Sequence, residues 1–521
     1  MIKKFIDKLL GKTTGSRAKA GPKVKGGIPL GKRVEVPHSE HRIDLALVDE
    51  RAIKVVQTLA KAGHEAYIVG GAVRDLLLGL RPKDFDVATN ATPEQVKALF
   101  RRAFIIGRRF RIVHVVYGRG REHEVIEVST FRAMVDAEAA PAVAGNEKTS
   151  QGQMAGKSHV VDAEGRVLRD NVWGPQIEDA ARRDFTINAM YYDPQSQIVV
   201  DYHGGMGDSK KKLLRMIGDP DTRYREDPVR IIRVVRFAAK LGFEIEAKTR
   251  QPIREMAALL ENVPPSRLFD EMFKLLQTGH SIASLAELRK QGLLKIFPVL
   301  EPVLAQDPRH AARHKFMALA LADTDRRVSE DKPVAPSFLL ACLLWHDVLG
   351  HWDTLKRKGD APIHALQQAV DAVFDARVGE ISGRGKLGAD MREIWMMQTR
   401  FERRGGNGPH TLVEQARFRA GFDFLRLRAD AGEVDASLAE WWEDFSMEDA
   451  DGRQALIEAV RRDQRGRPQQ ATEEAEYESP AEGESSSERT APARKRRRRR
   501  KPAGAGAGGA ATPSGGERAG E

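Results

Sequence analysis

The 521-residue sequence contains a single cysteine, Cys342, and lacks long uninterrupted runs of apolar residues. With one cysteine, the chain can form neither an intrachain disulfide nor a cysteine-based zinc site. No apolar run approaches the roughly 18 residues that a membrane-spanning helix requires. We therefore expect a cytoplasmic protein without an integral membrane segment. The basic residues 1–10 have apolar positions at helical spacing, which leaves open a peripheral contact with the inner face of the membrane.

Negative charge is the scarcer sign. The chain has 85 Lys and Arg against 74 Asp and Glu, which gives a formal net charge of +11. A surplus of positive charge favours polyanionic partners, namely nucleic acid, nucleotides or an anionic membrane, and says nothing about fold. The sequence also shows no repeat at a fixed period, which argues against a solenoid or a propeller.

Changes in composition predict an α+β protein of five parts. Short strand and helix patterns form a mixed head, whereas nearly every strong pattern from Pro228 to Phe445 is helical. Residues 135–160, rich in Ala, Gly, Ser and Gln, indicate an insertion or mobile loop. The predicted parts are a basic, poorly ordered leader (1–45), the head (46–200), a helical neck (201–270), a helical body (271–464) and a disordered tail (465–521) with an Arg/Lys run at 494–501.

The most informative segment joins a buried strand to a glycine turn. The pattern predicts a strand at Ala66–Val69, a turn at Gly70-Gly71 and a helix at Ala72–Leu78. Two residues without side chains let a phosphate approach the backbone, where the free N–H groups of the helix start can bind it. Arg74, one turn into the helix, can add a charge-assisted contact. A Gly-Gly turn before a helix is common, so this feature alone does not establish a phosphate site.

Two aspartates follow shortly afterwards. Asp84 and Asp86 lie two residues apart at the predicted strand Phe85–Ala88, and residues with that spacing project from the same face. Adjacent carboxylates repel each other, and a fold uses such a pair when a cation lies between them. Oxygen ligands of this kind suit Mg²⁺ or Mn²⁺ together with substrate phosphates. An isolated D-x-D is more often a solvated turn, but a preceding glycine turn makes the combination far more specific.

The third acidic residue of such a site is open between two candidates. Glu127 lies on the predicted strand Glu124–Thr130, and Asp184 follows Arg182 and Arg183. The two arginines would lower the pKa of Asp184 and supply phosphate contacts. The alternative for Arg183-Asp184 is a surface ion pair.

A basic cluster follows in the predicted neck. Asp227 before Pro228 predicts a helix N-cap with proline at the first helical position. Arginines then recur every three residues and share one broad face of the helix. Arginines on a helix are usually solvated, but beside a carboxylate they could contact a nucleotide base and its phosphates. The cluster comprises Glu226, Asp227, Arg230, Arg233 and Arg236.

These segments resemble the class II nucleotidyltransferases of bacteria, a family that includes poly(A) polymerase I and the CCA-adding tRNA nucleotidyltransferases. The matches occur in the family's order and spacing over roughly residues 50–270. They are Gly70-Gly71-x-x-Arg74-Asp75, Asp84-x-Asp86, Glu127–Arg132, Arg182–Asn188 and Glu226-Asp227-x-x-Arg230. The resemblance implies a polymerase β-type nucleotidyltransferase head with a mixed sheet, followed by an all-helical neck and body.

The resemblance also implies roles for the matching residues. The substrate would be ATP, the cofactor Mg²⁺ or Mn²⁺, and protein side chains would read the incoming base in place of a template. The implied roles are metal binding for Asp84 and Asp86, the third active-site carboxylate position for Asp184, triphosphate binding for Gly70, Gly71 and Arg74, nucleotide contact for Arg183, and base recognition for Asp227 and Arg230. Further nucleotide or phosphate candidates are Glu226, Arg233 and Arg236, and Glu127 is a candidate extra carboxylate.

Similarity outside the shared motifs favours the poly(A) polymerase branch, and hence AMP addition to RNA 3′ ends. The features are Leu76–Glu94 running into Gly107–Arg111, Arg223–Arg230, Pro264-Pro265-x-Arg267-Leu268-Phe269, and Trp441-Trp442-x-x-Phe445 before a basic tail. A CCA-adding enzyme and a non-catalytic basic RNA-binding protein remain alternatives. Expected RNA contacts are Lys210-Lys211-Lys212, arginines of the body and the 494–501 run, although the tail could instead solubilise the chain or dock RNA-decay proteins.

His346-Asp347 raises a rival hypothesis, because some CCA-adding enzymes carry a metal-dependent HD phosphohydrolase domain. His310, His314 and His351 lie nearby in sequence and could supply further ligands. The flanking residues nevertheless have the pattern of an ordinary buried helix, which favours a structural role for the pair.

Overall fold

The structure is a computed structural model. It describes residues 24–25, 28–107, 110–118, 123–134, 142–143, 159–162, 167–305, 307–332, 334–377 and 385–466. Most of the predicted insertion at 135–160, the first 23 residues, the tail from 467 onward and the Arg/Lys run at 494–501 lie outside the described residues.

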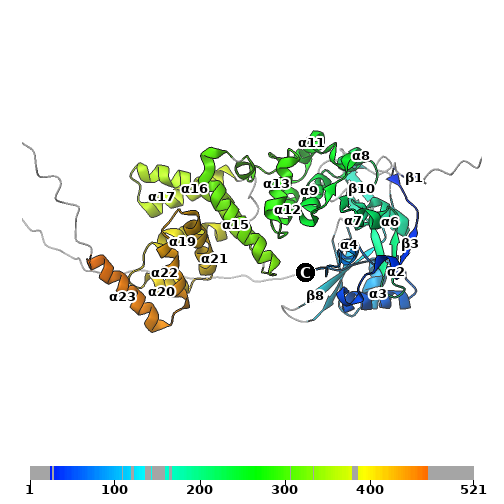
Figure 1. The fold of residues 1–521 in the computed structure, drawn as a ribbon, viewed down its shortest axis with the longest axis horizontal. Helices are drawn as coiled ribbons and strands as arrows, with labels where there is room; N and C mark the ends of the chain where they lie inside the picture. The colour runs from blue at the N-terminus through cyan, green and yellow to red at the C-terminus, as the bar shows by residue number, and fades with distance from the viewer. Residues whose placement is uncertain are drawn as a thin grey trace, which may run out of the picture. The chain divides into compact units, whose positions relative to one another are not determined.

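The head is built on a mixed sheet (Figure 1). Eight strands lie in the order β3-β13-β12-β4-β5-β8-β7-β6. Strands β5 and β8 are parallel, and the other neighbouring pairs are antiparallel. This sheet, with a mostly helical remainder, confirms the predicted α+β class. The strands are β3 (Val34–Pro37), β4 (Ala66–Val69), β5 (Asp86–Thr89), β6 (Ala103–Ile106), β7 (Ile112–Tyr117), β8 (Glu124–Thr130), β12 (Met190–Asp193) and β13 (Ile198–Asp201).

Local capping explains where the head helices begin. The side chain of Asp49 accepts the Arg51 backbone N–H at the start of α3, and Thr92 with Gln95 forms a reciprocal capping box at the start of α5. The helices are α2 (His38–His41), η1 (Leu45–Leu47), α3 (Glu50–Lys61), α4 (Gly71–Leu77), α5 (Pro93–Leu99), α6 (Gln176–Arg182) and η3 (Thr186–Asn188). Short strands outside the main sheet are β1 (Val24–Lys25), β2 (Ile28–Pro29), β9 (Ala142–Val143), β10 (His159–Asp162) and β11 (Val167–Asp170).

Alternation along the strands gives the sheet two apolar faces. Ile68 and Val87 belong to the buried cluster that includes the core side of α3. Their neighbours Val69 and Ala88 belong to a second cluster, with Tyr191 and part of α6. Successive side chains of a strand point to opposite faces, so Asp86, two residues before Ala88, lies on the α6 side of the sheet.

The leader predicted to be poorly ordered up to residue 45 is wrong for its second half. Strand β3 pairs with β13, from Val34 opposite Asp201 to Pro37 opposite Ile198. Val36 and Ile43 are buried, Ile43 completely. Strand β3 is a four-residue edge strand, where a proline is tolerated. A strand this short among Lys, Gly and Pro residues gives little periodic signal.

The neck is helical apart from one short parallel pair, β14-β15, which corrects the all-helical expectation. Helix α9 also begins one residue later than predicted: Pro228 occupies the N-cap position without a side-chain cap, and Asp227 closes the preceding helix. The elements are α7 (Gly205–Lys210), β14 (Leu213–Leu214), α8 (Pro220–Glu226), α9 (Val229–Leu241), β15 (Glu244–Ile245), α10 (Ala247–Arg250), α11 (Ile253–Met256), η4 (Ala257–Asn262) and α12 (Pro265–Leu276).

The described part of the body consists of helices packed around large aromatic residues. Trp345, Trp395 and Phe424 lie in the same buried cluster as residues of α9 and α12. Phe401 and Trp442 centre a separate cluster formed by the last helices. Among the described residues, no helix combines the length and apolar character needed to cross a membrane. The helices are α13 (Ser281–Lys290), α14 (Glu301–Leu304), η5 (Pro308–His310), α15 (Ala311–Ser329), α16 (Pro336–Arg357), α17 (Pro362–Ala376), α19 (Gly385–Phe401), α20 (Gly408–Val413), α21 (Phe418–Ala431), α22 (Ala436–Met447) and α23 (Ala450–Gly466).

The corrected leader gives a direct test of the fold. Ile43→Ala removes a fully buried side chain and should lower the free energy of unfolding by about 2–5 kcal/mol. Val34→Ala is the matched control, because Val34 is 51% exposed and should change stability by no more than about 0.5 kcal/mol. Urea unfolding of the full chain measures both, and equal small effects would mean that this segment does not pack on the head.

Candidate active site

The glycine turn lies between β4 and α4. Gly70 has φ +75° and ψ −131°, a conformation that essentially only glycine adopts, and its N–H donates to the Met190 carbonyl. A Cβ placed on Gly70 would come within 3.5 Å of an Arg183 Nη atom. The turn is therefore pinned to β12 on one side and faces a guanidinium on the other, so a phosphate at this backbone would meet a positive charge.

Arg74, predicted to bind the triphosphate, is almost completely buried, with 2% of its surface exposed. Its Nε and Nη2 bind Asp75 Oδ1 at 2.8 and 2.7 Å, and its Nη1 binds Asn188 Oδ1 at 2.7 Å. The guanidinium lies beside Gly71, where a Cβ would come within 3.4 Å of its Nη2, so triphosphate binding by Arg74 stays a prediction. Its visible role is to fix α4, and thus the glycine turn, against η3.

Arg183 lies at the centre of the site. Its Nη2 lies 3.1 Å from Asp179 Oδ2, and the Tyr191 hydroxyl donates to that same oxygen at 2.8 Å. The guanidinium also lies 5.4 Å from the centroid of the Tyr191 ring. Asp179 is buried, and although burial would raise its pKa, the charges of Arg183, Arg132 and Arg182 hold that pKa below its usual range. A permanently ionised carboxylate therefore fixes the direction of the Arg183 side chain.

The carboxylates gather where β5 and β8 run side by side. Asp86 and Glu127 are paired residues of the parallel ladder, so the predicted extra carboxylate lies next to the predicted metal ligand. Asp86 is exposed to solvent, yet surrounding protein together with the charges of Glu127 and Asp84 raises its pKa to about 6, against the opposing charge of Arg183. Among the described residues, neither Asp84 nor Asp86 forms an ion pair with a lysine or arginine of the chain. Repulsion at this strand pair is thus only partly offset by protein cations.

This donor set fits a divalent cation. No three His, Cys, Asp or Glu side chains of the described residues come close enough to hold a metal ion together. A site with one or two carboxylates is what Mg²⁺ requires, because that ion keeps several waters and binds substrate phosphates as well. The pKa of Asp86 is raised first by desolvation and then by the charges of Glu127 and Asp84, and a bound cation would offset the repulsion between these carboxylates.

Asp184 does not complete this cluster, which corrects its predicted position as the third carboxylate. Its Oδ2 accepts hydrogen bonds from Arg233 Nε at 2.8 Å and Nη2 at 2.5 Å, and its Oδ1 accepts from the Phe185 backbone N–H. Burial would raise the pKa of Asp184, but the charge and hydrogen bonds of Arg233 hold it below its usual range. The Asp184 side chain is 10% exposed and pairs with Arg233, whereas Arg183 pairs with Asp179, so the surface ion pair between Arg183 and Asp184 considered from the sequence is not formed. The pair of Asp184 with Arg233 joins the head to α9.

The predicted base-reading residues lie at the junction of α8 and α9. Arg230 Nη1 donates to Glu226 Oε2 at 2.8 Å and to the Arg223 carbonyl at 2.7 Å. Asp227 is the extended residue between the two helices, and its Oδ2 accepts from Arg267 Nη2 at 2.8 Å. The side chain turns to α12 rather than capping α9, which is why the predicted N-cap is absent. Both residues are half-buried.

Arg236, the last of the predicted neck arginines, is tied to the helix layer. It lies 3.7 Å from Glu271 Oε2 and stacks 4.6 Å from the centroid of the Phe237 ring. Arginines on a helix are usually solvated, but the Arg236 side chain is only 12% exposed. Its position is between α9 and α12.

Three residues with visible roles at the site were missed from the sequence. Asp179 orients Arg183, Asn188 connects Arg74 with Asp184, and Arg267 binds Asp227. Asp179 stands four residues before Arg183 on α6, a spacing that allows an ion pair. Asn188 lies 114 residues from Arg74, and Arg267 lies 40 residues from Asp227, so these two contacts carry no local signal.

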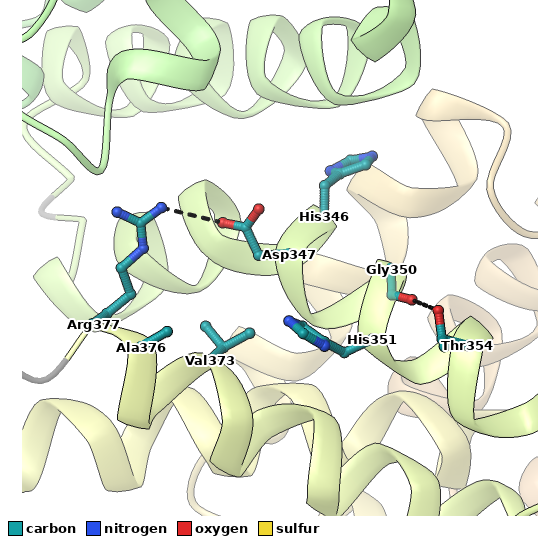
Figure 2. Close-up of a pocket in the computed structure, with 8 residues that line it drawn as sticks. All are labelled: His346, Asp347, Gly350, His351, Thr354, Val373, Ala376 and Arg377. Atoms are coloured by element: carbon teal, nitrogen blue, oxygen red, sulfur yellow. Dashed lines mark hydrogen bonds and ion pairs between the residues drawn. The ribbon is translucent and has the colours of Figure 1, made fainter.

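The HD hypothesis is not supported by the geometry around His346 and Asp347. These residues line a pocket of about 450 Å³ with Gly350, His351, Thr354, Val373, Ala376 and Arg377. Figure 2 shows the His346 and Asp347 side chains pointing apart. His346 Nε2 lies 3.1 Å from Glu433 Oε1, and Asp347 forms ion pairs with Arg313 and Arg377. Pairing with protein charges rather than a shared metal position agrees with a structural role.

A mixed sheet that presents a glycine turn, an arginine and a pair of uncompensated carboxylates defines a nucleotidyltransferase. Three family models match successive parts of the chain. They are the poly A polymerase head domain at residues 66–215, the probable RNA and SrmB-binding site of polymerase A at 242–304, and the polymerase A arginine-rich C-terminus at 358–502.

Curated relatives specify the family. Poly(A) polymerase I of Haemophilus influenzae is 42% identical over 415 residues, covering 79% of this chain and 87% of the relative. That of Salmonella typhi is 41% identical over 414 residues, covering 79% and 85%. A CCA-adding enzyme of Bacillus velezensis is 35% identical over 250 residues, covering 48% and 56%. The chain belongs to the poly(A) polymerase I family and is a polynucleotide adenylyltransferase, which confirms the resemblance found from the motifs.

The uncompensated charge of Asp86 predicts that removing it stabilises the metal-free fold. The folded-state pKa is about 6 and the usual value 3.8, so the cost of ionising Asp86 in the fold is absent below about pH 4 and complete above pH 6. In EDTA, Asp86→Asn should therefore raise the melting temperature at pH 7.5 by a few degrees, since 1 kcal/mol corresponds to about 2–4 °C. The difference should vanish toward pH 4.

Scanning fluorimetry of the full chain measures this effect. Glu124→Gln, an exposed carboxylate on β8, is the matched control and should shift the melting temperature little at either pH. Added Mg²⁺ should stabilise the wild type more than Asp86→Asn. A lower melting temperature for Asp86→Asn in EDTA at pH 7.5 would contradict the electrostatic description of the site.

Proposed function

We propose that this chain adds AMP units from ATP to RNA 3′ ends without a template, by metal-dependent nucleotidyl transfer, and thereby promotes RNA turnover. The mechanism rests on one observation. Within the described part of the chain, Asp84 and Asp86 form no ion pair with lysine or arginine, and they lie near a glycine turn that is close to the Arg183 guanidinium. The match of residues 242–304 to an RNA-binding region and the +11 net charge support RNA as the acceptor.

In the proposed reaction, the RNA 3′-hydroxyl oxygen forms a bond to the α-phosphorus of ATP while the bond from that phosphorus to the bridging oxygen breaks. Pyrophosphate leaves, and the hydroxyl proton passes to solvent. Asp84 and Asp86 would hold Mg²⁺ or Mn²⁺, and the bound ions would supply charge neutralisation and a more acidic hydroxyl. The protein's own contribution is position and fixed charge.

The remaining residues of the site bind the nucleotide in this proposal. Gly70 and Gly71 let the triphosphate approach the backbone, and Arg183, held by Asp179, contributes a fixed positive charge. Asp227 and Arg230 read the base, with the Arg230 guanidinium held by Glu226. The enclosed Arg74 side chain fixes the glycine turn through its hydrogen bonds to Asp75 and Asn188.

Replacing either aspartate should remove chemistry without removing the fold. Asp84→Asn or Asp86→Asn should lower kcat for AMP incorporation by at least about a thousandfold, because the metal ions lose a charged ligand. Incorporation of labelled ATP into a single-stranded RNA measures the loss, and RNA affinity should stay within about threefold of the wild type. Glu124→Gln, on the strand that carries Glu127, is the control and should remain active.

The outcomes separate the competing functions. An active Asp84→Asn/Asp86→Asn double variant would refute the mechanism, and a wild-type chain that incorporates nothing would leave only RNA binding. Long tails from ATP alone on a generic RNA agree with poly(A) addition. Use of CTP on tRNA lacking its end, stopping after three additions, would identify a CCA-adding enzyme.

RNA binding in this proposal is mainly electrostatic and independent of sequence. Candidate contacts are Lys210-Lys211-Lys212, which are all exposed, arginines of the body, and the Arg494–Lys501 run. The match of residues 358–502 to an arginine-rich C-terminus supports the last of these. The same tail could serve as the docking segment for RNA-decay proteins.

A full-length variant with residues 494–501 replaced by Gly and Ser tests the run. The plot of log affinity against log salt for single-stranded RNA should become shallower by about 0.7 for each phosphate that the variant no longer neutralises. Filter binding from low to moderate salt measures the slope, and kcat on a short primer should stay within about threefold. Replacing residues 480–487 in the same way, a segment without Lys or Arg, is the control. An unchanged slope for the first variant would assign the run to solubility or protein docking.

A further inference from the structure

The carboxylates of the site belong to a row of side chains that crosses the sheet. Asp86 on β5 lies opposite Glu127 on β8, and Glu127 lies opposite His114 on β7. His114 in turn lies opposite Phe104 on β6, the edge strand. His114 Nε2 lies 3.2 Å from Glu127 Oε1, so these two side chains share one face of the sheet. The row runs from the predicted metal ligand to the edge of the sheet.

The outer end of this row is open within the part of the chain that the structure describes. Phe104 is 55% exposed, and Ile106, two residues further along the same face, is 37% exposed. Ala103 and Ile105 instead belong to the apolar cluster on the opposite face, against which α5 packs. Exposed apolar side chains that adjoin a charged site are typical of a surface that binds a ligand.

The direction of the proposed reaction indicates which substrate this face receives. In phosphoryl transfer, the attacking and leaving oxygens lie roughly in line across the phosphorus. The glycine turn proposed to bind the triphosphate directly follows Val69, which lies opposite Asp86 on the β4 side of the row. The acceptor hydroxyl must then approach from the other side of Asp86, where β8, β7 and β6 lie.

The dimensions and charge of the face fit single-stranded RNA. Neighbouring strands lie about 4.8 Å apart, so three strand spacings place Phe104 about 14 Å along the row from Asp86. Stacked nucleotides rise by about 3.4 Å each, so that distance corresponds to about four nucleotides. Aromatic rings on a sheet face bind RNA by stacking on its bases. Arg101 and Arg102, both exposed immediately before β6, add positive charge that favours a polyanion over an apolar protein surface.

We infer that the β8–β7–β6 face binds the 3′ end of the acceptor RNA, with the Phe104 ring stacked on a base about four nucleotides from the reacting hydroxyl. The inference rests on the proposed addition of AMP to RNA and names where the acceptor lies. His114 keeps the surface continuous between Phe104 and Glu127. Because every base has a face that can stack, such a site agrees with RNA binding that is independent of sequence.

The test measures AMP incorporation by the full chain with ATP and Mg²⁺, on a trinucleotide primer and on a ten-nucleotide primer. Phe104→Ala should raise KM for the longer primer about tenfold, because one stacking contact is lost, and should leave kcat within about twofold. KM for the trinucleotide should not change, because that primer ends before it reaches the ring. Phe104→Trp should keep the wild-type KM for both primers, whereas Phe104→Leu should behave like Phe104→Ala.

Leu99→Ala is the matched control, because Leu99 is 37% exposed on α5, which packs on the opposite face of β6. It should leave KM unchanged for both primers. If Phe104→Ala has the wild-type KM for the longer primer, or raises KM equally for both, the inference is overturned. A lower melting temperature with an unchanged KM would also overturn it, since another segment or a second copy of this chain would then cover the ring. If the wild type extends neither primer, the proposed function itself fails.

Discussion

The arrangement of the site depends on the enclosed ion pair between Asp184 and Arg233. It connects the end of the head, where Asp184 follows α6, to the helix that carries Arg230. Breaking such a pair leaves an uncompensated charge in the protein, at a cost of about 3–5 kcal/mol. Asn188 extends the connection, because its side chain donates to Asp184 and accepts from Arg74. The glycine turn, the head and helix α9 are thereby fixed to one another.

Arg183, the residue next to Asp184, extends this connection to the glycine turn. Arg183 reaches the Gly70 turn, and its charge opposes the rise in the pKa of Asp86, while Asp184 binds α9. Two consecutive residues thus link β5, which carries Asp86, to the helix that carries Arg230. Charges are paired at the link, whereas no lysine or arginine of the described residues pairs with Asp84 or Asp86. A fold tolerates uncompensated repulsion where a ligand is to relieve it, which is why perturbed carboxylates gather at active sites.

The sequence predicted what depends on local pattern. Strands β4 and β8, the glycine turn and helix α4 were expected at or within one residue of their observed bounds, because alternation and glycine act over a few residues. The neighbouring positions of Asp86 and Glu127 could not be derived, since the parallel pairing of β5 with β8 brings together residues 41 apart.

Long-range pairing also explains the errors. Nothing near Arg74 indicates that its partner is Asn188, 114 residues away, so burial of this arginine could not be foreseen. Asp184 was expected beside Asp84 and Asp86 but pairs with Arg233, 49 residues away, for the same reason. Strand β3 was missed because only its pairing with β13 orders it. In each case the residue type indicated a role at the site, but the sequence did not indicate which distant residue it would pair with.

Apolar packing limits how far helix α9 can move. Phe185 and Ile187 of the head share one buried cluster with α9, α12 and the aromatic residues of α16 and α21. Interiors packed at this density resist small displacements, so α9 is held by the core as well as by its ion pairs. An enzyme that must accept two different bases in turn needs a site that shifts between additions. A site held by core and charges together instead suits a single kind of nucleotide, which agrees with a polynucleotide adenylyltransferase.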